Sequence, residues 1–124
     1  MRKNESAENY LETIYILSKR LPVVRSVDIA TELNFKKPSV SVAMKHLREK
    51  NQIVVSDAGF ITLTEEGRAV AEAIYERHTV LTKMFVLLGV PEEIAAEDAC
   101  QIEHILSDES FEAIKKHLKE KGPV

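Results

Sequence analysis

The chain has 124 residues, of which 44% are hydrophobic and 30% charged, with four glycines and four prolines. This length suits one ordinary domain or two small ones, and the composition excludes a disordered or low-complexity protein. Neither a membrane span nor an apolar signal segment is predicted, so we expect a cytoplasmic protein without a membrane partner. The single cysteine, Cys100, excludes an internal disulfide bond.

The net charge of -3 is divided unevenly along the chain. Residues 1–50 contain ten Lys/Arg and six Asp/Glu, whereas residues 51–124 contain seven and fourteen. A basic first part is suited to contact phosphate groups, and an acidic second part is suited to bind cations. The alternative is a chance distribution of surface charge.

Three helices are predicted in the first fifty residues. We expect the first over about residues 4–19 and a short second one over residues 27–33, capped by the hydroxyl of Ser26. Pro38 suits the first position of the third helix, because its missing N–H is not needed there, and this helix continues to about Lys50.

A β-hairpin and three more helices are predicted in the rest of the chain. Residues 53–55 and 60–63 are rich in strand-forming types and flank a turn sequence. The later helices are expected from Thr64 to the Gly89 turn, over residues 92–106, and from a cap at Ser107 to near Gly122 and Pro123.

The order of these elements is typical of a winged helix-turn-helix followed by an all-helical domain. The fold class is therefore predicted to be mainly α, with the small β-hairpin as the wing. We expect residues 1–63 to form the DNA-binding domain and residues 64–124 to form the helical domain.

The third helix carries the features expected of a recognition helix. Its outer face holds Ser39, Val42 and Lys45, and an exposed valine among polar side chains is suited to contact a thymine methyl in the major groove. Lys36 and Lys37 precede this face and are placed to reach phosphates. The alternative is an ordinary solvated helix with one stray valine. The predicted DNA-contacting residues are Lys36, Lys37, Pro38, Ser39, Val42 and Lys45.

Five potential metal ligands stand at unusual positions. Cys100, Glu103 and His104 are spaced i, i+3 and i+4, which places three ligand types on one arc of a helix. His78 interrupts the apolar stripe of the long helix, which continues to Leu88, and Glu12 lies in a first helix with almost no polar side. One divalent cation would satisfy all of these groups, whereas independent core residues would each need a separate partner. Ile94 and Ile105 belong to the apolar arc of the next helix, and the apolar faces of both helices are expected in the core.

The chain resembles the diphtheria-toxin-repressor and manganese transport regulator family of metal-dependent transcriptional regulators. The resemblance covers essentially the whole chain and is carried by residues 7–15, 36–41 and 97–109, of which the Cys-x-x-Glu-His segment followed by Leu-Ser-Asp-Glu is quite specific. It implies a homodimer that binds a palindromic operator in double-stranded DNA, with a second domain that dimerises and binds iron(II) or manganese(II). The ligands implied by the match are Asn9, Glu12, His78, Cys100, Glu103 and His104.

The ligand set departs from both branches of the family. Two-domain manganese regulators usually have Glu at position 100 and Asp at position 9. Iron-type members have the Cys at position 100 but a Met at position 9. The iron-type members also carry ancillary ligands, and Thr82 and Ala96 stand at two of those positions in this chain. A thiolate favours a softer ion. We therefore expect Fe(II) as first choice and Mn(II) as second, with Co(II), Zn(II) or Ni(II) as further candidates in vitro.

The expected function is that of a repressor that binds DNA when loaded with metal and controls iron or manganese homeostasis. An ion held by Glu12 from the first domain and by ligands from the second would select the helix spacing that fits two half-sites. No pattern for catalysis or for a small-molecule substrate is present, so an enzyme is not expected. Two alternatives stay open: a redox-sensing DNA-binding regulator using Cys100, which requires an exposed thiol, and a helical metalloenzyme or metal carrier.

Overall fold

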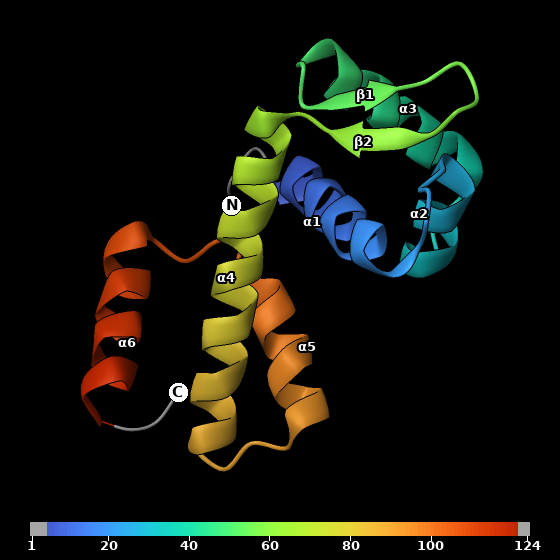
Figure 1. Cartoon of the computed structure of the whole chain (residues 1–124). Helices are drawn as coiled ribbons and strands as arrows, with labels where there is room; N and C mark the ends of the chain where they lie inside the picture. Colours follow the sequence, from blue (N-terminus) through green and yellow to red (C-terminus); the bar gives the residue numbers. More distant parts are fainter. Residues whose placement is uncertain (1–4, 122–124) are drawn as a thin grey trace. The chain divides into compact units, whose positions relative to one another are not determined.

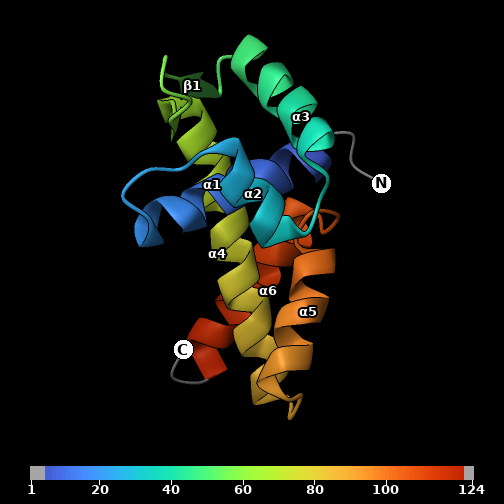
Figure 2. The same cartoon turned by 90° about the vertical axis from the view of Figure 1, so that its right-hand side faces the viewer.

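The computed structural model describes residues 5–121, which form six helices and one β-hairpin (Figures 1 and 2). This confirms the predicted fold class. The described residues divide into two compact units, one over 6–72 and one over 73–121 together with Glu5. The predicted helix start at Asn4 and the predicted end near Gly122 and Pro123 lie outside the described residues. The elements are α1 (Glu5–Arg20), α2 (Ser26–Leu33), α3 (Lys37–Glu49), β1 (Ile53–Val55), β2 (Ile61–Leu63), α4 (Glu65–Leu87), α5 (Glu92–Ile102) and α6 (Asp108–Lys121).

The start of α2 differs from the prediction. Ser26 is the first residue of the helix, and Arg25 occupies the capping position. The backbone N–H of Arg25 donates a hydrogen bond of 2.9 Å to the carboxylate of Asp28, so an acidic side chain in the first turn replaces the expected serine cap. At its other end α2 stops at Asn34, which adopts a left-handed conformation with φ of 57°.

Helix α3 begins one residue before the predicted position. Lys37 is its first residue and Pro38 its second, a position whose N–H also has no partner within the helix. Val40, Met44 and Leu47 are buried and Ala43 is half-buried, as their spacing predicts. The inner face of α3 is therefore fixed by apolar packing, which leaves the opposite face exposed.

The hairpin pairs β1 with β2 in antiparallel register, with Ile53 opposite Leu63. Phe60 is not part of β2, contrary to the prediction, because its N–H bonds to the hydroxyl of Ser56 in the turn. Beyond the hairpin, the N–H of Ile61 donates to the carbonyl oxygen of Val24, at 2.8 Å. The wing is thus tied by its backbone to the segment that precedes α2.

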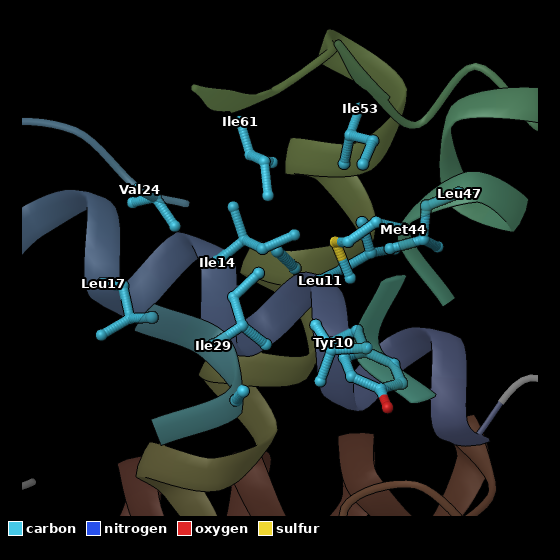
Figure 3. Close-up of a cluster of buried hydrophobic side chains, with 13 residues drawn as sticks. Tyr10, Leu11, Ile14, Leu17, Val24, Ile29, Met44, Leu47, Ile53 and Ile61 are labelled. Carbon is cyan, nitrogen blue, oxygen red and sulfur yellow. The ribbon is translucent and has the colours of Figure 1, made fainter. Parts of the chain in front are cut away.

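The core of the first unit gathers side chains from its helices and from both strands (Figure 3). Leu11 and Ile14 of α1 lie at its centre with no exposed surface, and Ile29 of α2 is equally buried. Burial also raises the pKa of Tyr10, whose ring meets Phe35 edge to face at 6.0 Å. The apolar periodicity of the sequence thus accounts for this core.

Gly67 is the point of closest approach between the first turn of α4 and the backbone of Gln52. A Cβ atom at Gly67 would lie 2.0 Å from the carbonyl oxygen of Gln52. That oxygen accepts the N–H of Thr64, whose own hydroxyl accepts the N–H of Gly67 and so caps α4. Only glycine fits here without displacing a hydrogen-bonded backbone.

Gly67→Ala is therefore expected to destabilise the protein, although the same change in a free helix would stabilise it by roughly 1 kcal/mol. The clash is with backbone rather than with a flexible side chain, so we expect a net loss of about 2 kcal/mol. Urea unfolding followed by circular dichroism measures it, with the exposed neighbour Glu66→Ala as the control. An unchanged or raised midpoint for Gly67→Ala would contradict the close approach.

The second unit is built from the part of α4 that follows Glu72 and from α5 and α6, with α5 running beside α4 in both views (Figures 1 and 2). The turn between them is made by Gly89, in a left-handed conformation with φ of 102°, as predicted. The hydroxyl of Ser107 accepts the N–H of Ser110, which confirms the predicted cap of α6. Among the described residues, no helix is long and apolar enough to cross a membrane.

Two predictions for this unit are wrong. Helix α5 ends at Ile102 rather than Leu106; the N–H groups of Ile105 and Leu106 both bond to the carbonyl of Ile102, which makes a tight turn instead of a further helical turn. In addition, part of the expected apolar core is exposed to solvent. The exposed members are Leu88, Ile94 and Ile105.

Candidate metal centre and DNA-binding surface

Glu103 is the centre of a polar cluster in the second unit. Its side chain is completely buried, in the turn that follows α5. One carboxylate oxygen, Oε1, lies 2.8 Å from Nδ1 of His78, which comes from the middle of α4 and is partly buried. The structure therefore brings together two of the predicted ligands from different helices.

The second carboxylate oxygen of Glu103 has no hydrogen-bond partner. This atom, Oε2, is buried, and the buried imidazole of His104 lies nearby, with Nε2 at 3.4 Å. A buried carboxylate oxygen without a partner is costly. Carboxylate oxygen and imidazole nitrogen are ligands that divalent transition metals prefer, so these residues fit a metal ion.

Arg77 is a buried charged residue next to this cluster that was not among the predicted site residues. Its guanidinium donates to the carbonyl oxygens of Glu103, at 3.1 Å, and Leu106, and to the carboxylate of Asp108. Its position three residues after Ile74 and four before Leu81 places it in the buried stripe of α4. An arginine within that stripe was the available signal, since a buried charge needs partners.

The remaining predicted ligands differ in their surroundings. Cys100, one turn before Glu103 on α5, is exposed, so it meets the condition set for the redox alternative. In the first unit, Glu12 is buried on α1, and Asn9 is half-buried with its carbonyl oxygen bound by the hydroxyl of Thr13, at 2.8 Å. Within the second unit the cluster thus consists of His78, Glu103 and His104.

The predicted DNA-contacting residues share one exposed surface at the start and outer face of α3. Val42 has 55% of its surface exposed, although a valine gains from burial. One further cation lies at the wing, where the guanidinium of Arg25 stacks on the ring of Phe60, 4.9 Å from its centre. The exposed residues are Lys36, Lys37, Pro38, Ser39, Val42 and Lys45.

Two family models match most of the chain. Residues 4–57 match the N-terminal DNA-binding domain of the iron-dependent repressors, and residues 64–121 match the metal-binding and dimerisation domain of the same proteins. Together they account for the winged helix-turn-helix and for the unit that holds the buried cluster.

Individual relatives agree with this assignment. An uncharacterized HTH-type transcriptional regulator of Methanocaldococcus jannaschii is 36% identical over 115 residues, 90% of this chain and 91% of its own length. The transcriptional regulator MntR of Escherichia coli O157:H7 is 31% identical over 120 residues, 97% of this chain and 77% of its own. The iron-dependent repressor IdeR of Mycobacterium tuberculosis is 30% identical over 115 residues, 92% of this chain and 50% of its own.

A solved structure shows the same fold. The manganese regulator SloR superposes with a TM-score of 0.79 at 28% identity, over 96% of this chain and 55% of the SloR chain. This chain therefore spans about half of that protein. From the matching domains, the relatives and the shared fold, the chain belongs to the iron-dependent repressor family of metal-dependent transcriptional regulators, which includes MntR and IdeR.

Proposed function

We propose that this protein represses transcription by binding a palindromic operator as a homodimer when a divalent metal occupies the site around Glu103. The observation that carries the proposal is the buried carboxylate oxygen of Glu103 with no hydrogen-bond partner, 3.4 Å from the imidazole of His104. A buried carboxylate oxygen with no hydrogen-bond partner in the metal-free protein needs an explanation, and an ion that binds to this oxygen provides one.

The proposed ligand set extends this cluster. His78, Glu103 and His104 supply two imidazoles and a carboxylate from the second unit, and the family resemblance adds Asn9, Glu12 and Cys100. When bound, the metal supplies positive charge that compensates the buried carboxylates. Iron(II) is our first choice and manganese(II) our second, because MntR and IdeR are both relatives and the thiol of Cys100 favours the softer ion.

The DNA-binding surface is assigned to the exposed side of α3. Its lysines are placed to contact phosphates, and Val42 is placed to contact a thymine methyl. We propose the domain division at residues 63 and 64, with the DNA-binding domain before it. A dimer that presents two such helices about 34 to 36 Å apart would occupy two half-sites one DNA turn apart.

The self-association surface is assigned to exposed apolar side chains in the second unit. Leu87, the last residue of α4, and Leu88 after it have 59% and 74% of their surfaces exposed, and Ile94 near the start of α5 is 49% exposed. Exposed apolar side chains of this size are unfavourable in water and are typical of a protein interface. The match to a dimerisation domain supports a second copy of this chain as its partner.

The test of the function is DNA binding with and without metal. Duplexes would be selected from random sequence in the presence of anaerobic Fe(II), and their affinity for the protein measured by fluorescence anisotropy, with and without chelator. We expect palindromic selected sites and an affinity that falls at least tenfold on chelation. Lys37→Ala should weaken binding and reduce its salt dependence, whereas Lys119→Ala on α6 should not. A DNA affinity that is the same with and without chelator would contradict the proposal.

Cys100→Glu tests the choice of metal. The variant replaces a soft thiol by a hard carboxylate, so the preference should move from Fe(II) toward Mn(II). The measurement is the metal concentration that gives half-maximal DNA binding, for each ion under anaerobic conditions. A wild type that prefers Mn(II), or a variant whose preference does not move, would remove the sulfur from the ligand set. Peroxide that releases DNA from the wild type but not from Cys100→Ser would instead support the redox alternative.

A further inference from the structure

The guanidinium of Arg77 lies at the C-terminal end of α5, where it binds carbonyl oxygens of the turn that follows the helix. Three acceptors surround it: the carbonyl oxygens of Glu103 and Leu106, and the carboxylate of Asp108 at the start of α6. The side chain is only 7% exposed, and its guanidinium lies 5.2 Å from the centre of the Phe111 ring. This one side chain therefore joins α4 to the turn after α5 and to α6.

The chemistry of arginine suits this position. The last carbonyl groups of a helix have no partner within the helix, and a buried end must find donors elsewhere. The planar guanidinium carries five N–H donors in a fixed fork, so it can serve several acceptors at once, whereas a lysine ammonium acts as a point charge. The early end of α5 at Ile102 follows from these bonds, since Arg77 satisfies the carbonyls of the turn.

Arg77 and its neighbour His78 hold the same residue at two points. Arg77 bonds to the main-chain oxygen of Glu103, and His78 Nδ1 lies 2.8 Å from the Oε1 atom of its side chain. These two contacts fix the direction of the Glu103 side chain, and its second oxygen is buried without a hydrogen-bond partner, 3.4 Å from Nε2 of His104. The direction in which the carboxylate faces is thus set from α4.

We propose that Arg77 is a positioning residue that holds the Glu103–His104 turn in its metal-binding conformation before metal arrives, with Asp108 fixing the guanidinium. The inference rests on the proposed function, because it concerns the same site. Pre-organised ligands bind more tightly, since no free energy is spent on ordering them. Loss of the Arg77 contacts should therefore lower metal affinity without changing which residues are ligands.

A neighbouring ion pair provides the matched control. Glu76, adjacent to Arg77 on α4, accepts a hydrogen bond of 3.2 Å from Lys115 of α6, and this bond raises the pKa of Lys115. The pair joins α4 to α6, as Arg77 and Asp108 do, but the ion pairs of Lys115 are with Glu76 and Glu112 and not with the turn at 103–106. Glu76→Gln thus removes a tie between the helices and leaves the turn intact.

The experiment compares Co(II) binding by the wild type, Arg77→Lys, Asp108→Asn and Glu76→Gln, in the full chain and without DNA. Titrations followed by Co(II) absorption would be made at a temperature where circular dichroism shows every metal-free protein folded. We expect about tenfold weaker binding for Arg77→Lys, about threefold for Asp108→Asn, and wild-type binding for Glu76→Gln. In the metal-free proteins, amide hydrogen exchange of Ile105 and Leu106 should be faster in the first two variants only.

The outcomes separate this inference from the proposed function. A wild type that does not bind Co(II) would overturn both. If the wild type binds Co(II), and Arg77→Lys and Asp108→Asn have the same Co(II) affinity and the same amide exchange rates as the wild type, only the positioning role would be overturned. Equal weakening in Glu76→Gln would also overturn it, because the effect would then belong to packing of α6. Should Arg77→Lys fail to fold, Asp108→Asn decides, since that side chain is 92% exposed.

Discussion

Replacement of Glu103 or His104 by alanine is expected to abolish metal-stimulated DNA binding while the protein stays folded. Both side chains are buried in the proposed site, so each variant loses a ligand that no exposed group can replace. We expect metal affinity to fall by roughly a hundredfold or more, since loss of even a residue that supports a ligand costs tenfold to a hundredfold. DNA binding at a fixed metal concentration should then match that of the chelated wild type.

Stability separates loss of a ligand from loss of fold. Glu103→Ala removes the buried Oε2 atom, which has no hydrogen-bond partner, but it also removes the 2.8 Å contact of Oε1 with His78 and leaves a small cavity, so we expect the metal-free variant to stay folded with a stability within about 2 kcal/mol of the wild type. Metal should raise the melting temperature of the wild type, by the equivalent of about 2.7 kcal/mol at a hundred times the dissociation constant, but not that of the variant. Glu97→Ala, exposed on α5, is the control. Metal-dependent DNA binding by Glu103→Ala would show that the ligand assignment is wrong.

The apolar periodicity of the sequence predicted most of the fold, because the apolar face of most helices is also the face that packs in the structure. The buried face of α3 and the left-handed Gly89 both lie where the sequence places them. The errors arise where a distant group replaces a local one. Helix α5 ends early because Arg77, from another helix, binds the carbonyls of the turn, and the cap of α2 comes from Asp28 because Arg25 rather than Ser26 precedes the helix.

The candidate site was predicted in part from spacing alone. The i, i+3 and i+4 rule places Cys100, Glu103 and His104 on one arc, but it assumes a continuous helix, whereas Glu103 and His104 follow its end. Their burial and the exposure of Cys100 depend on which helices cover the turn, and periodicity within one helix does not contain this information. Leu88 and Ile94 are exposed for a related reason: an apolar stripe does not indicate whether its partner is the same chain or a second copy.

Glu12→Gln is expected to separate metal binding from its effect on DNA binding. Glu12 is buried on α1, in the unit that carries the recognition helix, and we propose that it is the ligand through which a bound metal acts on that unit. Glutamine has nearly the same volume but no charge, so the core should be preserved. Metal should still bind through His78, Glu103 and His104, with moderate loss of affinity, while most of the gain in DNA affinity disappears.

The thermodynamic coupling between metal binding and DNA binding shows whether Glu12→Gln separates the two. If metal strengthens DNA binding by a given factor, DNA must strengthen metal binding by the same factor. Titrations of metal with and without selected duplex, and of duplex with and without metal, should give one large factor for the wild type and a factor near one for Glu12→Gln. Glu8→Gln, equally buried one turn earlier on α1, should keep the wild-type factor. Loss of metal affinity as large as the loss of DNA affinity would make Glu12 an ordinary ligand, and an unchanged factor would place the coupling in other residues.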